Sequence, residues 1–561
     1  MPEQEFNTAR PVLILGAGIN GCALARELLL NQVNVCLVDQ ADVASGATAY
    51  SSRLIHGGLR YLEYGEFDLV RESLAERTRL LRLAPHLVKP IRLAIPSRSR
   101  FSGLAAAALR FAGWRWWPLG SAHSERGLVL VRLGLNLYDA YARDPLLPRH
   151  SVESAANSSL PIDKRKFRWL ANYYDAQIPY PERLVLAMLK DGSRQSLEGG
   201  PKLTVLTYHQ AHLSGDEVSL TPTGSTNAGE RFKPLAIVNA TGAWVDDSLK
   251  RLHVSSERLI GGTKGSHFVT FHGGLRRALD GQGVYAEATD GRPIFILPLG
   301  HATLVGTTDL PWEEPPEAAR ATSDEIDYLL TAVQSVLPVL GLTRGDVDFH
   351  YSGVRPLPYV AAAQTAAITR RHFVVKHDQA ALPVYSIVGG KLTTCRSLAE
   401  QAAARILPDI GRKVIASSAG RLFPGAEGYP GSEAEVPATL AQLAAAHRLE
   451  LETVATIWRL HGTSTHEILR DIASEPRSMV PGTALLTSFV EWTIRNEWVS
   501  TLSDLVERRL MLLYDQRLTR PGLQRLAELL VAARSGSASD VTPIVERAIE
   551  RLLQRYGKRV E

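Results

Sequence analysis

A glycine motif close to the N-terminus constrains the fold of this 561-residue chain more than any other feature. The motif reads Gly16-Ala17-Gly18-Ile19-Asn20-Gly21, which has the spacing G-x-G-x-x-G. Residues 12–15 are apolar, residues 20–31 have a helical pattern, and residues 33–38 form a second apolar stretch that leads to Asp39. This order predicts a strand, a helix and a second strand parallel to the first, which together form one βαβ unit.

Each glycine of the motif has a separate physical task. Gly16 permits a tight turn, Gly18 lets the backbone approach a diphosphate, and Gly21 lets the helix pack on the strand. The diphosphate then lies at the N-terminus of the helix, where free N–H groups and the helix dipole favour negative charge. Asp39 is placed to bind an unphosphorylated ribose, which indicates FAD or NAD rather than NADP.

Two further strands favour FAD over NAD. Residues 235–238 lead into Thr241-Gly242, and residues 384–388 lead into Gly389-Gly390-Lys391. Taken alone, either turn would more often be an ordinary one. Ligands collect where parallel strands end, however, and only an extended cofactor could meet turns that lie hundreds of residues from Gly16.

The remaining chain predicts three further parts. Residues 44–58 are rich in small and polar side chains and should form a binding loop, followed by a charged helix at residues 66–83. Strand-like stretches at residues 266–270, 293–299 and 303–306 suit a second sheet that carries a substrate site. After about residue 421 the pattern is mainly helical, with periodic segments at residues 439–447, 451–460, 484–497 and 502–514.

Composition restricts the kinds of partner. The formal net charge of +5 could attract anionic substrates or lipids, or it could have no functional meaning. The basic residues are dispersed and no nucleic-acid-binding motif occurs, so we expect no nucleic-acid partner. No uninterrupted apolar run reaches about 18 residues, so any membrane contact should be peripheral. The cysteines Cys22, Cys36 and Cys395 are scattered, so we expect no disulfide framework, no metal site and a reducing, cytoplasmic compartment.

Beyond the glycine motif, the chain resembles the FAD-dependent glycerol-3-phosphate dehydrogenase family. Residues 45–63 resemble the second signature of that family. The resemblance spans almost the whole chain, including a helical C-terminal region that distinguishes this family from the shorter amine oxidases of the same fold. Further matching segments are residues 84–88, 239–244, 263–267, 306–309, 351–357 and 389–394.

The resemblance implies an α/β FAD-binding Rossmann-like fold of the glutathione-reductase and D-amino-acid-oxidase type, with a mixed-sheet substrate domain and an all-α C-terminal domain. We expect an oxidoreductase region over residues 1–420 and the helical domain over residues 421–561. The FAD-binding parts should lie at about residues 1–95, 150–260 and 345–410, with substrate-domain parts between them.

The implied reaction is the oxidation of sn-glycerol 3-phosphate to dihydroxyacetone phosphate, with hydride transfer to FAD and delivery of the electrons to a quinone. One alternative is an α-glycerophosphate oxidase, which passes the electrons to oxygen and produces hydrogen peroxide. Another is a non-catalytic binding protein with the same flavin fold. A homodimer is left open.

The resemblance also assigns residues to the substrate and the chemistry. A phosphate dianion calls for guanidinium groups, and Arg60, Arg355 and Arg370 are the candidates, together with Tyr61. Removal of the hydroxyl proton requires a base, for which His56 and His267 are alternatives. Lys391 should stabilise negative charge on the reduced flavin, and Arg355 is counted with these catalytic groups. The residues expected to bind FAD are Gly16, Gly18, Ile19, Asn20, Gly21, Asp39, Ser45, Thr48, Ser51, Ser52, Leu54, His56, Gly57, Gly58, Thr241, Gly242, Gly389, Gly390, Lys391, Leu392 and Thr393.

The chain departs from the family pattern at three places. Asp39 stands where a glutamate is commoner, and Arg53 stands where a lysine is usual. Residues 178–183 end in Glu182-Arg183, where the family typically has paired aspartates before the arginine. This last region is therefore not expected to work in the usual way, whereas the cofactor and phosphate motifs are unaffected.

Residues 98–118 interleave four arginines with aromatic and aliphatic side chains. The segment is too short and too basic to span a bilayer. Its aromatic residues, among them Trp114, Trp116 and Trp117, could enter the headgroup region while the arginines meet anionic phosphates. The alternative is a hairpin packed on the protein's own core. We expect the segment to dock the enzyme on the inner face of the cytoplasmic membrane, where a lipid-soluble quinone is within reach.

Overall fold

The glycine motif belongs to a six-stranded, mainly parallel sheet. The computed structural model describes residues 10–102, 127–225, 229–288, 290–361, 369–475 and 477–561. β1 (Val12–Leu15) is fully buried and pairs in parallel with β2 (Val35–Asp39) on one side and β11 (Ala236–Asn239) on the other. The predicted βαβ unit is therefore confirmed. The strand order is β18-β19-β11-β1-β2-β7, with β7 at Leu203–Thr207, β18 at Phe373–His377 and β19 at Val384–Val388.

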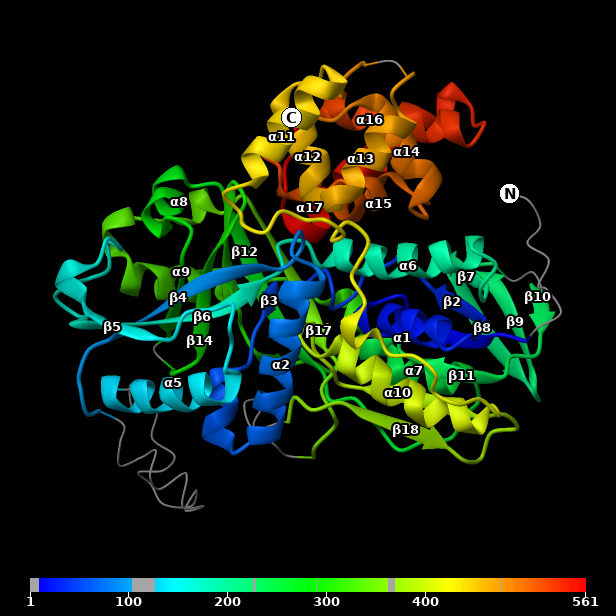
Figure 1. Ribbon diagram of the computed structural model, residues 1–561, viewed down its shortest axis with the longest axis horizontal. Coiled ribbons are helices and arrows are strands. Elements are labelled where there is room, and N and C mark those ends of the chain that lie inside the picture. The colour runs from blue at the N-terminus through cyan, green and yellow to red at the C-terminus, as the bar shows by residue number, and fades with distance from the viewer. Residues whose placement is uncertain (1–9, 103–126, 226–228, 289, 362–368, 476) are drawn as a thin grey trace.

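Helices cover both faces of this sheet (Figure 1). On one face, α1 (Ile19–Leu30) packs between α6 (Pro181–Leu197) and α10 (Cys395–Asp409), and their apolar side chains form one core. On the other face lie α7 (Val245–Arg251) and a small antiparallel sheet of β8 (His209–Ser214), β9 (Glu217–Pro222) and β10 (Glu230–Phe232). The carboxyl ends of the parallel strands therefore remain available for a ligand.

The second predicted sheet is present and is larger than expected. Its ten strands follow the order β16-β12-β15-β14-β13-β4-β6-β3, while β17 pairs with β12 and β5 pairs with β6. Short β3 interrupts the predicted loop at residues 44–58. Helices α2 (Phe67–Leu83), α5 (Leu128–Ala142), α8 (Gly273–Leu279) and α9 (Ser323–Val336) pack around this sheet. The strands are Leu54–Ile55 (β3), Lys89–Ser97 (β4), Ser151–Ser154 (β5), Trp169–Gln177 (β6), Thr263–Thr270 (β12), Gly283–Glu287 (β13), Pro293–Leu299 (β14), Ala302–Gly306 (β15), Leu310–Pro311 (β16) and Phe349–Arg355 (β17).

The C-terminal part is helical, as predicted, and lies against the ten-stranded sheet and against α6, which covers the six-stranded sheet (Figure 1). Its helices share a continuous apolar core with the ten-stranded sheet. The periodic segment at residues 502–514 does not form one regular α-helix: the chain forms a short helix (α15, Leu502–Asp504), a π-helical turn (Leu505–Arg509) and a 3-10 turn (Leu512–Tyr514). The other helices are Val436–His447 (α11), Leu451–His461 (α12), Thr465–Asp471 (α13), Thr487–Asn496 (α14), Arg520–Ala533 (α16) and Val541–Tyr556 (α17).

The expected membrane-docking segment falls mostly outside the described residues, since residues 103–126, with all three of its tryptophans, are not among them. The residues on either side of the stretch 103–126 lie together: the N–H of Gly127 donates to the carbonyl of Ser102 at 2.8 Å, and the N–H of Leu128 donates to that of Ser99 at 3.0 Å. Among the helices the structure describes, none combines the length and the apolar character needed to cross a bilayer.

Candidate active site

A cavity of about 730 Å³ opens where the parallel strands of the six-stranded sheet end. It is lined by the turns after β1, β2, β11 and β19, by the loop at residues 45–54, and by residues of β12 and β17 from the second sheet. The structure thus brings together segments that lie far apart in the sequence. Expected cofactor residues that line the cavity are Gly16, Gly18, Ile19, Asn20, Asp39, Ser45, Thr48, Ser51, Ser52, Leu54, His56, Thr241, Gly242, Gly389, Gly390, Lys391, Leu392 and Thr393.

The geometry of the glycine motif fits a bound diphosphate. A Cβ atom on Gly16, which has φ +101°, would lie 2.6 Å from the carbonyl oxygen of Ala240, and one on Gly21 would lie 1.9 Å from that of Gly16. These two glycines are thus required by the packing of the protein itself. A Cβ on Gly18 would meet only the Thr48 hydroxyl, at 3.5 Å, and would otherwise project into free space. The room that Gly18 leaves suits a phosphate group at the N-terminus of α1.

Asn20 joins the glycine motif to the turn after β19, and Asp39 lies at the end of β2. The side-chain amide of Asn20 donates to the carbonyl of Gly389 at 3.2 Å, and its Oδ1 is buried without a partner among the described residues. The Asp39 carboxylate accepts the N–H groups of Ala17 and Ala41 at 2.7 and 2.8 Å. Burial raises the pKa of Asp39 to about 6, although these two donors oppose the shift. A buried acceptor left open and a carboxylate on the cavity wall are the groups that a nucleotide cofactor can satisfy.

Two arginines that line the cavity, Arg355 and Arg370, approach one carboxylate. Arg355 donates to Asp309 at 3.1 Å and to the Thr307 hydroxyl at 2.9 Å, and Arg370 lies 3.6 Å from the other oxygen of Asp309. Burial lowers the pKa of Arg355 against the opposing effect of Asp309, and Arg370 lowers it further. Two guanidinium groups and one carboxylate leave a net positive charge, which complements a phosphate dianion. The side chain of Arg60 lies outside the described part of the structure.

The two candidate bases differ in their access to the cavity. His56 is partly open to it, and burial lowers the pKa of its ring to about 4. His267 is 1% exposed, with Nε2 2.9 Å from the Ser52 hydroxyl and its ring stacked on Tyr351. Burial, followed by Arg355 and Arg53, lowers the pKa of His267 well below its usual range. Both rings are therefore neutral near pH 7, but Ser52 already occupies one nitrogen of His267.

Lys391 is fixed between two side chains. Its Nζ donates to the Ser73 hydroxyl at 2.6 Å and lies 4.7 Å from the centre of the Tyr61 ring. Burial lowers the pKa of Lys391 to about 7. The amine is thus poised to be charged or neutral near physiological pH, and small changes in its surroundings decide which.

Some expected residues do not line the cavity, and some important ones were not expected. Three expected cofactor residues do not line the cavity: Gly21, which packs against Gly16, and Gly57 and Gly58, which instead leave room for Leu74 and for the Tyr61 ring. Sequence reasoning assigned no role to Asp309, although it lies in a segment that resembles the family. Ser73 lies on α2 in a charged helical pattern that gave no signal. No group of His, Cys, Asp and Glu residues suited to a metal ion occurs in the described part of the chain.

Two departures from the family pattern meet in the structure. Arg53 and Glu182 form a buried ion pair at 2.8 Å, with side chains that are 0% and 2% exposed. The second carboxylate oxygen of Glu182 accepts from Arg53 at 3.1 Å. Arg53, which replaces a lysine, and Glu182, which replaces an aspartate, thus form one bidentate ion pair, which explains how both departures are accommodated.

Comparison with known proteins agrees with this geometry. The family model described as DAO, FAD dependent oxidoreductase, matches residues 11–396. A glycerol-3-phosphate dehydrogenase of Synechocystis is 34% identical over 90% of this chain and 89% of its own length, and the aerobic enzyme of Escherichia coli is 33% identical over 71% and 74%. A D-erythritol 1-phosphate dehydrogenase of Brucella abortus is 29% identical over 89% of this chain and 93% of its own.

A solved structure shows the same fold. The glycerol-3-phosphate dehydrogenase from Bacillus halodurans, complexed with FAD, aligns with a TM-score of 0.73 at 20% identity over 98% of this chain and 95% of its own. Together with the family match, this makes FAD the cofactor for which the cavity is built. The chain therefore belongs to the family of FAD-dependent oxidoreductases, and its relatives include glycerol-3-phosphate dehydrogenases.

Proposed function

We propose that the protein oxidises sn-glycerol 3-phosphate to dihydroxyacetone phosphate and delivers the electrons to a quinone. The choice of substrate rests on Arg355 and Arg370, which line the cavity and both approach Asp309. Guanidinium groups bind phosphate with several hydrogen bonds and stay charged at any working pH. The names of the relatives point to the same class of substrate, a small polyol phosphate.

In this proposal His56 is the base that takes the proton from the C2 hydroxyl. When bound, FAD supplies the acceptor for the hydride that leaves C2. The imidazole of His56 is neutral above about pH 4, so it can accept a proton in the working range. Two hydrogen bonds between its backbone and the Thr393 hydroxyl hold His56 at 3.1 and 3.3 Å against the turn that follows β19. His267 is hydrogen-bonded to Ser52, so in this proposal it holds the loop that lines the cavity in place and does not take the proton.

Lys391 provides a second ionisable group beside the reacting atoms. Tyr61 and Ser73 hold the amine in place, so its charge is fixed in position. We propose that the charged form stabilises negative charge that develops in the cavity during the reaction. Because the pKa of Lys391 is about 7, the amine can be neutral before the reaction and charged when negative charge develops beside it.

The substrate is tested by anaerobic titration of the yellow holoprotein. Glycerol 3-phosphate should bleach the flavin absorption band, and glycerol should not, because it lacks the group that Arg355 and Arg370 bind. D-erythritol 1-phosphate is the decisive competitor, since a relative is named for it. If it bleaches the flavin at lower concentration than glycerol 3-phosphate, the arginine pair binds a phosphate but the assigned substrate is wrong.

The electron acceptor is tested separately, because a quinone-linked enzyme and an oxygen-using oxidase share the substrate half of the reaction. With glycerol 3-phosphate in air, the proposal predicts little hydrogen peroxide and rapid reduction of a quinone analogue under nitrogen. Stoichiometric peroxide with slow quinone reduction would assign the protein to the oxidases instead.

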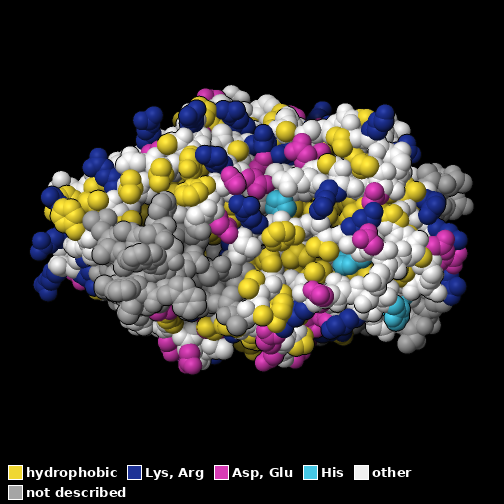
Figure 2. Space-filling view, turned by 90° about the horizontal axis from the view of Figure 1, so that it is seen from below, with side chains coloured by type: hydrophobic (Ala, Val, Ile, Leu, Met, Phe, Trp, Pro, Cys, Tyr) yellow, Lys and Arg dark blue, Asp and Glu magenta, His cyan; other side chains and the backbone are white. Residues whose placement is uncertain are grey.

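Access to a quinone requires a surface that meets the membrane, and we propose that α5 forms part of it. Val129, Leu133 and Leu137, which follow one another at intervals of four residues along α5, are 40%, 58% and 40% exposed. Apolar and basic side chains occur side by side on the face of the molecule seen in Figure 2. Arg132, which lies on α5 next to Leu133, is exposed, and the backbone of Arg100 lies beside the start of the helix, since the N–H of Val129 donates to its carbonyl at 3.0 Å. An apolar stripe beside arginines is suited to anionic lipid, so we propose peripheral attachment to the inner face of the cytoplasmic membrane.

We further propose that residues 1–420 form the oxidoreductase region and residues 421–561 a separate helical domain. The shift to an all-helical pattern after residue 421 supports this division. The shared apolar core indicates that the two parts are docked firmly rather than loosely linked.

A further inference from the structure

The cofactor loop, defined here as residues 42–53, contacts two different parts of the molecule. One surface forms a large part of the cavity wall, so the position of the loop sets the shape of the FAD site. The other surface is covered by the C-terminal helical region. The loop residues that line the cavity are Ser45, Gly46, Ala47, Thr48, Tyr50, Ser51, Ser52 and Arg53.

The backbone of the cofactor loop is strained near both ends. Ala44 has φ +59° and Arg53 has φ +57°, and neither residue is a glycine. Residues with side chains adopt this left-handed conformation only when their surroundings impose it. The loop therefore needs contacts from outside itself to keep the shape in which it lines the cavity.

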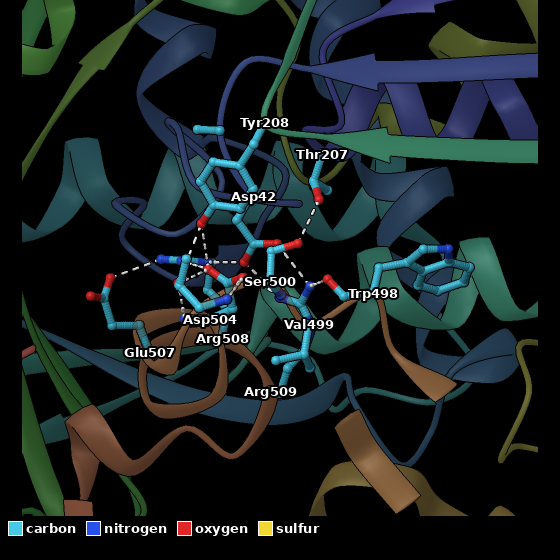
Figure 3. A network of polar contacts seen from close by, with 12 residues as sticks. Asp42, Thr207, Tyr208, Trp498, Val499, Ser500, Asp504, Glu507, Arg508 and Arg509 are labelled. Atoms are coloured by element: carbon cyan, nitrogen blue, oxygen red, sulfur yellow. Dashed lines mark hydrogen bonds and ion pairs between the residues drawn. The ribbon is translucent and has the colours of Figure 1, made fainter. Parts of the chain in front are cut away.

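The C-terminal region supplies those contacts at the first end of the loop (Figure 3). The Asp42 carboxylate accepts from Arg508 at 2.5 Å and from Arg509 at 2.7 and 2.8 Å. All three side chains are at most 3% exposed. The two guanidinium groups hold the pKa of Asp42 below its usual value, although burial alone would raise it. Both arginines come from the π-helical turn at Leu505–Arg509, and both reach this one carboxylate although they are consecutive in the chain.

The middle and the second end of the loop are held in the same way. The Tyr50 hydroxyl lies 3.3 Å from that of Tyr556 on α17, and the Arg555 guanidinium lies 4.8 Å from the centre of the Tyr50 ring. Arg53 donates to the Tyr514 hydroxyl at 2.5 Å. Three separate contacts thus join the loop to the C-terminal region.

We propose that the C-terminal helical region holds the cofactor loop in its FAD-binding conformation, with Asp42, Arg508 and Arg509 as positioning residues for the cofactor. Because the loop is shared, FAD binding and the docking of the C-terminal region must stabilise each other. The proposal depends on FAD alone and stands or falls independently of the substrate and the electron acceptor.

The test compares two buried carboxylates that are each held by two arginines. Asp42→Asn removes the charge that faces Arg508 and Arg509. Asp191→Asn is the matched control, because Asp191 is held by Arg26 and Arg421 at 2.7 Å but lies on α6, outside the cofactor loop. Both changes should lower the melting temperature.

Only Asp42→Asn should weaken FAD binding, by roughly 5- to 150-fold, which is the usual range for coupling between two sites. The dissociation constant is measured from flavin fluorescence on dilution of the holoprotein. Equal changes in the dissociation constant for the two variants would overturn the proposal.

A second measurement needs no variant and covers the case in which Asp42→Asn fails to fold. Amide hydrogen exchange of the wild-type protein, with and without FAD, should show slower exchange at residues 502–514 when FAD is bound. Residues 436–447, on α11, serve as the internal control and should change little. If residues 502–514 exchange at the same rate in both states, the C-terminal region does not respond to the cofactor and the idea is wrong.

Discussion

Replacing Gly18 by valine should separate FAD binding from folding more cleanly than any other change in the glycine motif. Gly18 has φ −77° and ψ −176°, an extended conformation that valine adopts readily. A Cβ there meets only the Thr48 hydroxyl, at 3.5 Å. The protein without FAD should therefore lose no more than about 0.5 kcal/mol of unfolding free energy.

The same valine fills the space over the N-terminus of α1 into which a diphosphate must come. A hydrogen bond to a charged group contributes about 1.5–3 kcal/mol. Loss of two such bonds to the diphosphate would cost about 3–6 kcal/mol, which corresponds to FAD binding weaker by roughly two to four orders of magnitude. Gly18→Val should therefore give folded, colourless protein.

Gly21→Ala is the control, because its Cβ would lie 1.9 Å from the carbonyl oxygen of Gly16. Overpacking of this kind costs about 1–3 kcal/mol whether or not FAD is present. Thermal unfolding of FAD-depleted protein, together with FAD titration by fluorescence quenching, distinguishes the two variants. If Gly18→Val binds FAD within about tenfold of the wild type, the diphosphate does not lie over Gly18 and the assignment of the motif is mistaken.

Four further predictions concern the substrate, the base, the pH and the membrane. Arg355→Ala should reduce kcat/KM for glycerol 3-phosphate by about 2–5 kcal/mol, roughly thirtyfold to several thousandfold, while glycerol loses little; equal losses would exclude Arg355 as a phosphate ligand. His56→Asn should lower kcat by about 10²- to 10⁴-fold with normal FAD content, and a larger loss in His267→Asn would reverse the roles given to the two rings. The rings of His56, His86, His267 and His461 stay neutral in the folded protein, whereas the unfolded chain protonates them near pH 6.5. Their contribution to the unfolding free energy is therefore fully present above that pH, and it should fall by about 1.4 kcal/mol per pH unit for each ring between about pH 6.5 and 4. A constant melting temperature over this range would contradict the neutral state of these rings. Changing Trp114, Trp116 and Trp117 to Ser, together with Leu133 and Leu137, should release the protein from membranes and lower quinone reduction in vesicles without affecting flavin reduction, and an unchanged membrane fraction would favour a segment packed on the protein itself.

The parts of the fold that follow from local pattern could be predicted from the sequence. β1 and β19 begin and end at the expected residues, because short apolar runs between turn-forming residues specify buried parallel strands. The break in the helical pattern at residues 502–514 could not be foreseen, since the arginines of its π-helical turn pair with Asp42, which lies more than 460 residues earlier in the chain.

The same contrast holds at the candidate site. Turns rich in glycine are visible in the sequence, and their meeting in one cavity could be expected from the rule that ligands gather at strand ends. Ser73 and Asp309 act through partners brought to them by the fold, so nothing in their own neighbourhoods signals a role. The different exposure of His56 and His267 likewise depends on packing from other segments, which pattern alone does not contain.

The strand order of the six-stranded sheet has a consequence for how the protein is made. β1 lies between β2, which follows it closely in the chain, and β11, which begins at Ala236. During synthesis the N-terminal βαβ unit must therefore wait, with one edge of β1 unpaired, until some 200 further residues have left the ribosome. Waiting edges of this kind are prone to aggregation and to capture by chaperones. The turn at Gly390, where an added Cβ would lie 2.5 Å from the Asn20 side chain, arrives later still. The glycine motif is thus synthesised early, but the part of the cavity around it is complete only when most of the chain has been made.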